Sequence, residues 1–319
     1  MAFDVSALGA YTKQSLKPLL TSAVIGAKTQ EKILKKGILL TGVKSAEAIP
    51  LMDTDAVFQQ QSCSFDPSGT TTFTQRTVTV GKIKVNEKLC PRDLETKFTQ
   101  EALNAGSNYD SFGNTEFETA FMDKKTARIA AQNEVALWQG DTNSVTANLN
   151  KFDGLIKLID AGSPIDANVS GFTGIATVTT LSQSNAIAVV KGVKNAIPSA
   201  LKGMEGLEIC CGYDFFDMFV DAGIAANLFH YDYNDASNYE MKIPGTNIML
   251  TALHGLDGTG DLYAFRWGNV AMGVDLVADE TNLKLWYSED NDDVRFRANW
   301  KLGVNVAFTN ECVKFKAAI

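Results

Sequence analysis

Thr115–Gln139, TEFETAFMDKKTARIAAQNEVALWQ, is the stretch of sequence that decides the fold. It contains no glycine or proline and is filled with residues of high helix propensity, so we expect one continuous helix. The capping-box spacing of Thr115 and Glu118 marks its start, and Gly140 marks its end. At about 1.5 Å per residue such a helix is roughly 37 Å long. Its apolar residues recur at spacings of three, four or seven and therefore share one face: Phe117, Ala120, Phe121, Ala127, Ala131, Val135 and Trp138.

The composition excludes several classes of protein. A chain of 319 residues with 45% hydrophobic residues can build a sizeable core. A net charge of −8 argues against a sequence-reading nucleic-acid protein but is compatible with one that encloses nucleic acid. No apolar run reaches membrane-spanning length, and the first residues do not follow a signal-peptide pattern, so we expect no membrane association. The five scattered cysteines fit reduced cytosolic thiols, and Cys210 and Cys211 are expected to be small core residues.

The segments before the long helix lack a core of their own. Residues 1–50 suggest an arm with a short amphipathic helix near Leu16–Val24, followed by a basic cluster of Lys32, Lys35 and Lys36. That cluster is either a solvated face or a phosphate-binding patch. Thr70–Val80 and Lys82–Leu89 alternate in polarity, which predicts two antiparallel strands paired with each other as a ribbon. A two-stranded ribbon is marginal alone, so both segments are expected to pack on something else, including another chain.

The segments after the long helix predict two further regions. Residues 165–275 contain helices at Ser182–Ile197 and Tyr213–Ala222 and a buried strand at Leu207–Cys211, an α/β pattern. Further strands are expected at 247–253, 261–267 and 270–276. The strands at 282–287, 294–302, 304–308 and 313–315 are expected to form one sheet. Its apolar face needs a cover, which favours the long helix as a rigid strut over the alternative of an ordinary core helix.

Local signatures of catalysis are missing from the sequence. There is no phosphate loop, nucleophile elbow, zinc-protease motif or C-x-x-C pair. His230 and His254 have no partner at ligand spacing, and the glycine-rich Gly255–Gly260 precedes a strand instead of opening a helix. The acidic segments Asp232–Glu240 and Glu289–Asp293 lack the residue order of a calcium loop. We therefore expect no catalytic, cofactor-binding or metal-binding residues and no cofactor.

The order of elements, and several short motifs, resemble the major capsid protein of tailed bacteriophages with the Hong-Kong-97-type fold. The motifs follow one another in the expected order along the chain: Glu134–Asp141 (EVALWQGD), Phe152–Leu155 (FDGL), Ile243–Thr246 (IPGT), Trp267–Asn269 (WGN), Gly273–Asp275 (GVD), Lys284–Tyr287 (KLWY), Val294–Arg297 (VRFR) and Leu302–Val304 (LGV). The likeness covers essentially the whole chain.

The resemblance implies an α+β fold with named parts. Residues 1–50 would be the N-terminal arm and residues 51–92 an extension loop, a β-hairpin that lies over a neighbouring subunit. Residues 93–164, with a spine helix at 115–139, and the returning strands of 276–319 would form the peripheral domain. Residues 165–275 would form the axial domain. Candidate inter-subunit contacts are Arg76, Lys82, Lys84 and Lys88 in the extension loop and Lys32, Lys35 and Lys36 in the arm.

The function implied by the resemblance is structural. Copies of the chain would assemble as pentamers and hexamers into an icosahedral shell around double-stranded DNA, without sequence-specific binding. Implied partners are the chain itself, a portal, a separate scaffolding protein and, in some relatives, a decoration protein. Some members of the fold crosslink subunits through Lys–Asn bonds, but no motif here marks a partner. Two alternatives stay open: an encapsulin-type nanocompartment shell with the same fold, and an α/β enzyme that uses the acidic loops.

Overall fold

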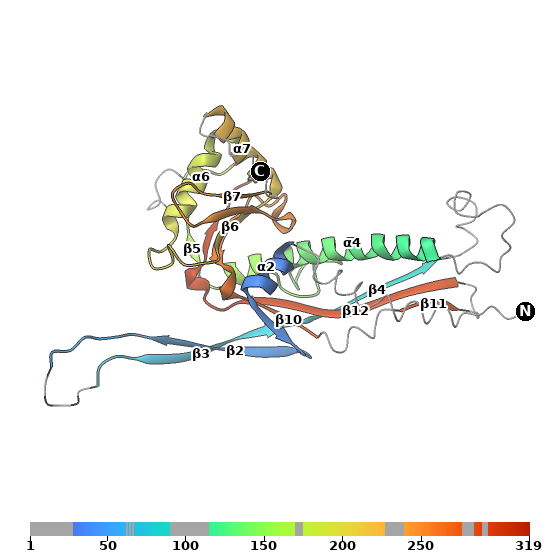
Figure 1. Cartoon of the computed structure of the whole chain (residues 1–319), viewed down its shortest axis with the longest axis horizontal. Helices are drawn as coiled ribbons and strands as arrows, with labels where there is room; N and C mark the ends of the chain where they lie inside the picture. Colours follow the sequence, from blue (N-terminus) through green and yellow to red (C-terminus); the bar gives the residue numbers. More distant parts are fainter. Residues whose placement is uncertain are drawn as a thin grey trace, which may run out of the picture.

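The chain folds into an elongated α+β molecule in which a long helix and a thin ribbon extend in opposite directions (Figure 1). The computed structural model describes residues 28–61, 63, 65, 67–89, 115–169, 175–226, 239–275, 284–288 and 293–319. The expected helix near Leu16–Val24, His230, and most of the two acidic segments lie outside the described residues.

A five-stranded sheet carries the long helix. Its strands run in the order β1 (Ile38–Thr41), β10 (Val270–Val274), β12 (Asp293–Val306) and β11 (Lys284–Ser288), and β4 (Gly81–Leu89) pairs with the other edge of β12. Helix α4 (Thr115–Gln139) lies along β4 and β12 (Figure 1). One apolar cluster joins its Leu137 and Trp138 to the inward side chains of β12, which are Phe296, Ala298, Trp300 and Leu302. The expectation that the long helix covers the terminal strands is confirmed.

Two shorter helices complete this first core. Helix α2 (Lys28–Lys36) contributes the fully buried Ile33, and α5 (Leu155–Asp160) contributes Leu155 and Ile159. The arm was expected to have no core of its own, and α2 indeed packs on elements far along the chain. Those elements belong to the same subunit: α4, β10 and the short helix η3 (Trp267–Asn269).

A second, six-stranded sheet forms a separate layer with its own core. Its order is β5 (Ile165–Asp166), β13 (Val313–Phe315), β9 (Leu262–Arg266), β6 (Leu207–Cys211), β8 (Met249–Ala252) and β7 (Glu240–Lys242). Helices α6 (Gln183–Ala196) and α7 (Tyr213–Ala225) pack on it through Val189, Val193 and Phe215. A capping box between Ser182 and Asn185 fixes the start of α6. The single turns η3, between β9 and β10, and η4 (Thr309–Glu311), between β12 and β13, lead from one sheet to the other, whereas η2 (His254–Leu256) joins β8 to β9 within the six-stranded sheet.

The thin ribbon consists of β2 (Ala46–Thr54) and β3 (Thr71–Thr79), paired antiparallel from Ala46↔Thr79 to Thr54↔Thr71. The end of the ribbon that contains Ile49, Leu51 and Val78, which we call its root, packs on Ala271 of the five-stranded sheet and on Ala307, the residue after β12. Beyond the root the ribbon leaves the body of the molecule (Figure 1).

The predicted pairing of Thr70–Val80 with Lys82–Leu89 is wrong. Strand β3 pairs with β2, and β4 pairs with β12 from Leu89↔Val294 to Gly81↔Leu302. The chain does not reverse at Gly81, because that glycine is wedged against the backbone of Lys151, where an added Cβ would lie 2.2 Å from the carbonyl oxygen. β3 and β4 are therefore successive strands that join different sheets.

Two other strands also belong to a different sheet from the one expected. β10, which was predicted among the strands of the α/β region, lies between β1 and β12 in the five-stranded sheet. Val313–Phe315, which was predicted to continue the terminal sheet, pairs with β9 and β5 in the six-stranded sheet. The two sheets therefore exchange strands near the chain's end, which ties them into one body.

Candidate subunit-contact surfaces

A buried carboxylate joins helix α2 to the six-stranded sheet. The side chain of Glu208, on β6, is 2% exposed. One of its oxygens accepts a hydrogen bond from Lys32 Nζ at 2.6 Å, and the other accepts one from Lys36 Nζ at 2.8 Å. Thr251 Oγ1 donates to the same carboxylate at 3.0 Å, and Lys32 also pairs with Glu240 at 2.9 Å. Burial alone would raise the pKa of Glu208, but the bonds from the two lysines outweigh it and the pKa is lowered.

A second buried carboxylate, Glu134 on α4, meets the first turn of α2. Its oxygens accept hydrogen bonds from the backbone N–H of Thr29, at 3.0 Å, and from the Thr29 hydroxyl. Trp138 Nε1 donates to the same hydroxyl oxygen at 2.9 Å. A carboxylate at a helix N-terminus is electrostatically favoured, although burial raises the pKa of Glu134. Together Glu134 and Glu208 fix both ends of α2 to its own subunit.

The structure places the predicted arm residues in two different roles. Lys32 and Lys36 are tied to Glu208, so they hold the helix in place. Lys35 is 74% exposed and has only a long ion pair, 3.8 Å, with Glu31 on the same helix. Of these three, Lys35 is the one whose charge stays in solvent.

The predicted extension-loop residues are likewise divided between two elements. Arg76 lies on β3, where its guanidinium donates to Thr309 Oγ1 at 2.9 Å and so anchors the ribbon to the body. Lys82, Lys84 and Lys88 lie on β4, not on the ribbon, and all three are exposed. Lys88 approaches Asp293 at 3.4 Å.

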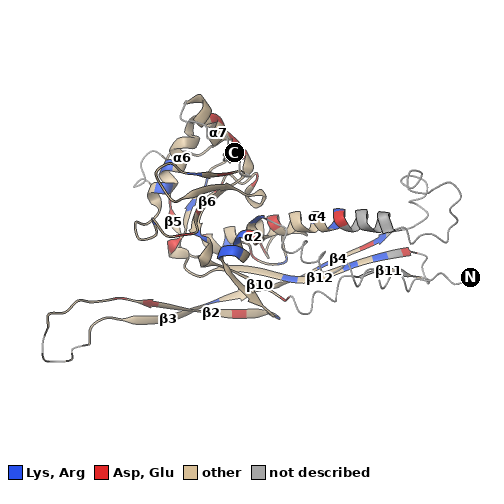
Figure 2. Ribbon diagram, viewed as in Figure 1, with Lys and Arg blue, Asp and Glu red and all other residues tan. Residues whose placement is uncertain are grey.

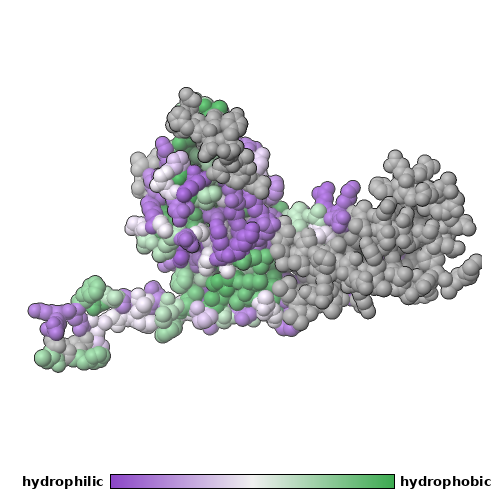
Figure 3. Space-filling view, viewed as in Figure 1, coloured by the Kyte–Doolittle hydropathy of each residue, from purple (hydrophilic) through white to green (hydrophobic). Residues whose placement is uncertain are grey.

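The part of the ribbon that extends beyond the body, together with the chain that joins β2 to β3, exposes large apolar side chains. Figure 3 shows apolar residues at its end. The exposed fractions are 59% for Met52, 53% for Val57, 100% for Phe58, 93% for Phe65 and 76% for Phe73. Isolated exposed apolar residues are common, but such a concentration on one thin segment is typical of a surface that is covered by a partner. The sequence pattern of alternating threonines did not reveal these five residues as a group.

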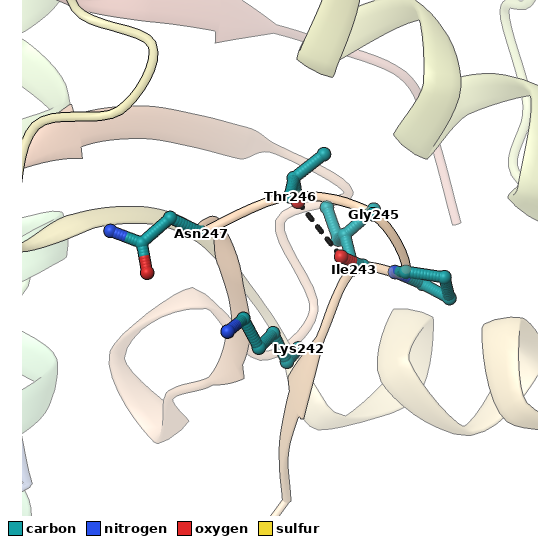
Figure 4. Close-up of a pocket in the computed structure, with 6 residues that line it drawn as sticks. Lys242, Ile243, Gly245, Thr246 and Asn247 are labelled. Atoms are coloured by element: carbon teal, nitrogen blue, oxygen red, sulfur yellow. Dashed lines mark hydrogen bonds between the residues drawn. The ribbon is translucent and has the colours of Figure 1, made fainter.

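A shallow hollow lies at the turn between β7 and β8 (Figure 4). It is lined by Lys242, Ile243, Pro244, Gly245, Thr246 and Asn247. Thr246 Oγ1 donates to the Ile243 carbonyl at 2.8 Å, which closes the turn. Lys242 is its sole titratable lining residue, so the hollow offers no acid–base pair, and the Thr246 hydroxyl has no basic partner among the lining residues.

The described residues that could support catalysis are poorly arranged for it. His254 is 68% exposed; its Nδ1 lies 2.8 Å from Asp257, and its ring stacks on Tyr213. Cys210, Cys211 and Cys312 are buried, and burial raises the pKa of each thiol, that of Cys312 to about 12. Across the described parts of the chain, no three His, Cys, Asp or Glu side chains come together as a metal site. No helix in those parts is long and apolar enough to cross a bilayer.

Comparison with known proteins identifies the fold. No family model and no curated protein matches the chain. Solved structures do match along most of its length. A procapsid of satellite phage P4 containing the size-determination protein Sid has a TM-score of 0.62 at 10% identity, covering 98% of this chain and 96% of the other. The capsid of an empty GTA particle gives 0.54 at 12% identity and covers 100% of both chains. Gordonia phage Cozz gives 0.55 at 10% identity, covering 90% of this chain and 86% of the other. The chain therefore has the Hong-Kong-97-type capsid fold that the sequence predicted.

Proposed function

We propose that this chain is the repeating subunit of an icosahedral shell, the major capsid protein of a tailed bacteriophage. The observation that carries the proposal is the β2–β3 ribbon. It leaves the body of the subunit and exposes Phe58, Phe65 and Phe73, for which no described element of the same chain provides a cover. The phage-capsid neighbours of the fold support a virion location and assembly with further copies of the chain.

The ribbon and the surface that would receive it are different parts of one chain. A contact between unlike surfaces is head-to-tail, and it closes into rings when the rotation per subunit is right. Rings of five and six copies, the pentamers and hexamers of the proposal, are the units from which a closed icosahedral shell is built. The division into an arm (1–50), an extension loop (51–92), a peripheral domain (93–164 and 276–319) and an axial domain (165–275) remains a prediction, with β2 and β3 as the extended element.

The shell would enclose double-stranded DNA without reading its sequence. The chain's net charge of −8 is consistent with a container to which the contents do not adhere strongly. We propose a portal, a separate scaffolding protein and a decoration protein as further partners, and a structural role without catalysis, cofactor or membrane. An encapsulin-type compartment has the same fold class and is distinguished by its contents, a cargo enzyme in place of DNA.

Truncating the ribbon tests the proposal. Joining Met52 to Phe73 through an Asn-Gly turn removes the free end and keeps a hairpin geometry suited to antiparallel strands. The contacts of Ile49, Leu51 and Val78 with the body are untouched, so the variant should melt at the same temperature as the unassembled full chain. Mass photometry and negative-stain electron microscopy should then find closed shells only for the full chain and for a Thr72→Ser control. Closed shells of the truncated variant in normal yield would overturn the assignment of the ribbon.

A further inference from the structure

Helix α2 is bonded to both cores of the subunit. Its first turn contacts Glu134 of α4, and its lysines contact Glu208 of the six-stranded sheet. Figure 2 shows α2, with its basic residues, between the two sheets. A helix of nine residues is too short to be stable alone in water, so α2 stays helical because it is docked. The two carboxylates therefore determine how firmly α2 is held.

Glu134 is a buried carboxylate without an ion-pair partner in the described part of the chain. It is 4% exposed, and its oxygens accept hydrogen bonds from the Thr29 backbone N–H, at 3.0 Å, and from the Thr29 hydroxyl. Both donors belong to α2. A buried carboxylate without a cation is costly unless it is hydrogen-bonded or protonated. The negative charge on Glu134 therefore depends mainly on contacts that α2 supplies.

Three titratable groups face Glu134 from neighbouring elements: Lys28 of α2, His254 of η2 and Tyr213 of α7. Lys28 and His254 each lie beside another carboxylate, at 3.7 Å and 2.8 Å respectively, and a phenol supplies no positive charge. The N-terminus of α2 adds a partial positive charge of its own. None of these groups replaces the counter-ion that a buried carboxylate requires.

The charge on Glu134 and the docking of α2 depend on each other. In the docked state, burial disfavours the ionised form and raises the pKa of Glu134. Undocking of α2 would return the carboxyl group to water, where its pKa is about 4.3. Docking therefore favours the protonated form, and by linkage the proton favours docking. The docked state is most stable below the pKa of the exposed group and loses stability as the pH rises through the raised pKa.

The contact at the other end of α2 does not titrate in the same range. Glu208 accepts hydrogen bonds from Lys32 and Lys36, at 2.6 Å and 2.8 Å, and these bonds lower its pKa. The other titratable groups around it are Glu240, which pairs with Lys32 at 2.9 Å, and the Cys210 thiol, whose pKa is raised by burial. Glu208 therefore stays ionised between pH 4.5 and pH 8 and holds α2 equally well throughout.

The two cores have contacts that do not involve α2. Gln139 Nε2 of α4 donates to the Gly255 carbonyl of η2 at 2.9 Å. Gly255 also lies directly against Trp138, since an added Cβ would be 2.1 Å from its Cδ1 atom. The chain crosses from one sheet to the other at η3 and η4 as well. The cores would therefore stay joined when α2 undocks, so undocking does not require the whole subunit to unfold.

We propose that a proton on Glu134 controls the docking of α2, while Glu208 acts as an anchor that does not change over the same pH range. The helix joins the two cores firmly at mildly acidic pH and loosens as the pH rises. The subunit thus carries a local, reversible conformational change at the junction of its two sheets. This device goes beyond the shell function and does not depend on it.

Hydrogen–deuterium exchange of the full chain in one assembly state tests the proposal. After correction for the intrinsic exchange rate, protection of the α2 amides should fall from pH 4.5 to pH 8, by up to about tenfold per pH unit, the limit for one proton. Because the opening is local, α2 should be at least about tenfold less protected than the fully buried strand β6 at every pH.

Three variants separate the roles of the carboxylates. Glu134→Gln cannot ionise but can still accept a hydrogen bond from the Thr29 N–H, so it should keep α2 as protected at pH 8 as the unmodified chain is at pH 4.5. Glu208→Gln should lower the protection of α2 at every pH and leave its pH dependence in place. Glu31→Gln is the matched control on the same helix, where the side chain is 50% exposed, and should change neither the protection nor its pH dependence.

Two kinds of result would overturn the proposal. Protection of α2 that is constant from pH 4.5 to pH 8, or a pH dependence that survives in Glu134→Gln, would exclude control by this carboxyl group. Equal protection of α2 and β6 would show that α2 opens only when the whole subunit unfolds. Shell assembly enters none of these measurements, so either result would leave the proposed function as it stands.

Discussion

Replacing Glu208 by glutamine should destabilise the subunit substantially. The substitution keeps the size of the side chain and removes the charge that Lys32 and Lys36 share. Lys32 Nζ, on a side chain only 11% exposed, would then face an amide at the position where the carboxylate oxygen lies at 2.6 Å. It would keep Glu240 as a partner, at 2.9 Å.

The expected loss follows from the burial of the pair. Removing one partner of a buried ion pair costs about 3–5 kcal/mol, and the remaining contact with Glu240 argues for the lower end, about 3 kcal/mol. For a chain of 319 residues that corresponds to a fall in melting temperature of roughly 4–5 °C. The lowered pKa of Glu208 gives the effect a pH dependence. Its stabilising contribution is present above the unfolded pKa of about 4.3 and is lost as the pH falls through the lower folded value.

Thermal unfolding at pH 7, with all variants in the same assembly state, is the assay. Lys35→Met is the matched control on the same helix, because its ion pair is 3.8 Å long and exposed and should be worth less than about 0.5 kcal/mol. The double change Lys32→Met with Glu208→Met should cost less than the sum of the single changes, since it removes both charges. A Glu208→Gln protein that melts within 1 °C of the unmodified chain (roughly 0.7 kcal/mol or less) would refute the reasoning.

Three further predictions concern the core and the thiols. Gly255→Ala should destabilise the fold by about 1–3 kcal/mol, because the new Cβ would lie 2.1 Å from Trp138 Cδ1. Thermal or denaturant unfolding measures this loss, and an unchanged unfolding midpoint would contradict the close packing of Gly255 on Trp138. The raised pKa of Glu134 means that this group stabilises the fold most at a pH below its unfolded pKa, and that this stabilisation is lost as the pH rises through its folded pKa. Glu134→Gln should therefore make the free energy of unfolding depend less on pH between pH 4 and pH 8. An unaltered pH dependence would exclude a stabilising role for the protonated Glu134 side chain. Cys63 is exposed, and Cys63→Ser should remove one fast-reacting thiol from a titration of the native protein; no loss would mean that this part of the ribbon is covered.

The elements with local signals could be predicted from the sequence. The helix at Thr115–Gln139 agrees with its predicted bounds because propensity, capping and the absence of breakers all act within the segment. The strand Leu207–Cys211 also agrees, since a short apolar run between turn signals has few other solutions.

Strand pairing could not be predicted in the same way. Gly81 between two alternating segments is compatible with a hairpin, yet its close approach to Lys151 keeps the chain extended. The true partner of β4 is β12, more than 200 residues away, and nothing local in either strand encodes that register. Val313–Phe315 is only three residues long, so alternation says little about which sheet it joins.

Whether the candidate residues contact another copy of the chain stays a prediction, and their contacts within the chain could not be predicted from the sequence. The basic cluster in the sequence predicted Lys32 and Lys36 as contact residues. The sequence alone could not show that both lysines form ion pairs with Glu208 of the same chain. Glu208 had a recognisable signal, a lone charge in a fully buried strand, which requires a partner. Glu134 had none, because an acidic residue in a long helix is ordinarily solvated.

The most direct test of the account is the size of the purified full-length chain, measured by mass photometry together with negative-stain electron microscopy. The account predicts closed shells or rings of five and six copies. Particles should also be assayed for DNA and for cargo protein after nuclease treatment, because DNA supports a virion and a cargo enzyme supports an encapsulin. A folded chain that remains monomeric or dimeric at high concentration, alone and when co-expressed with a candidate scaffolding protein, would contradict the central claim.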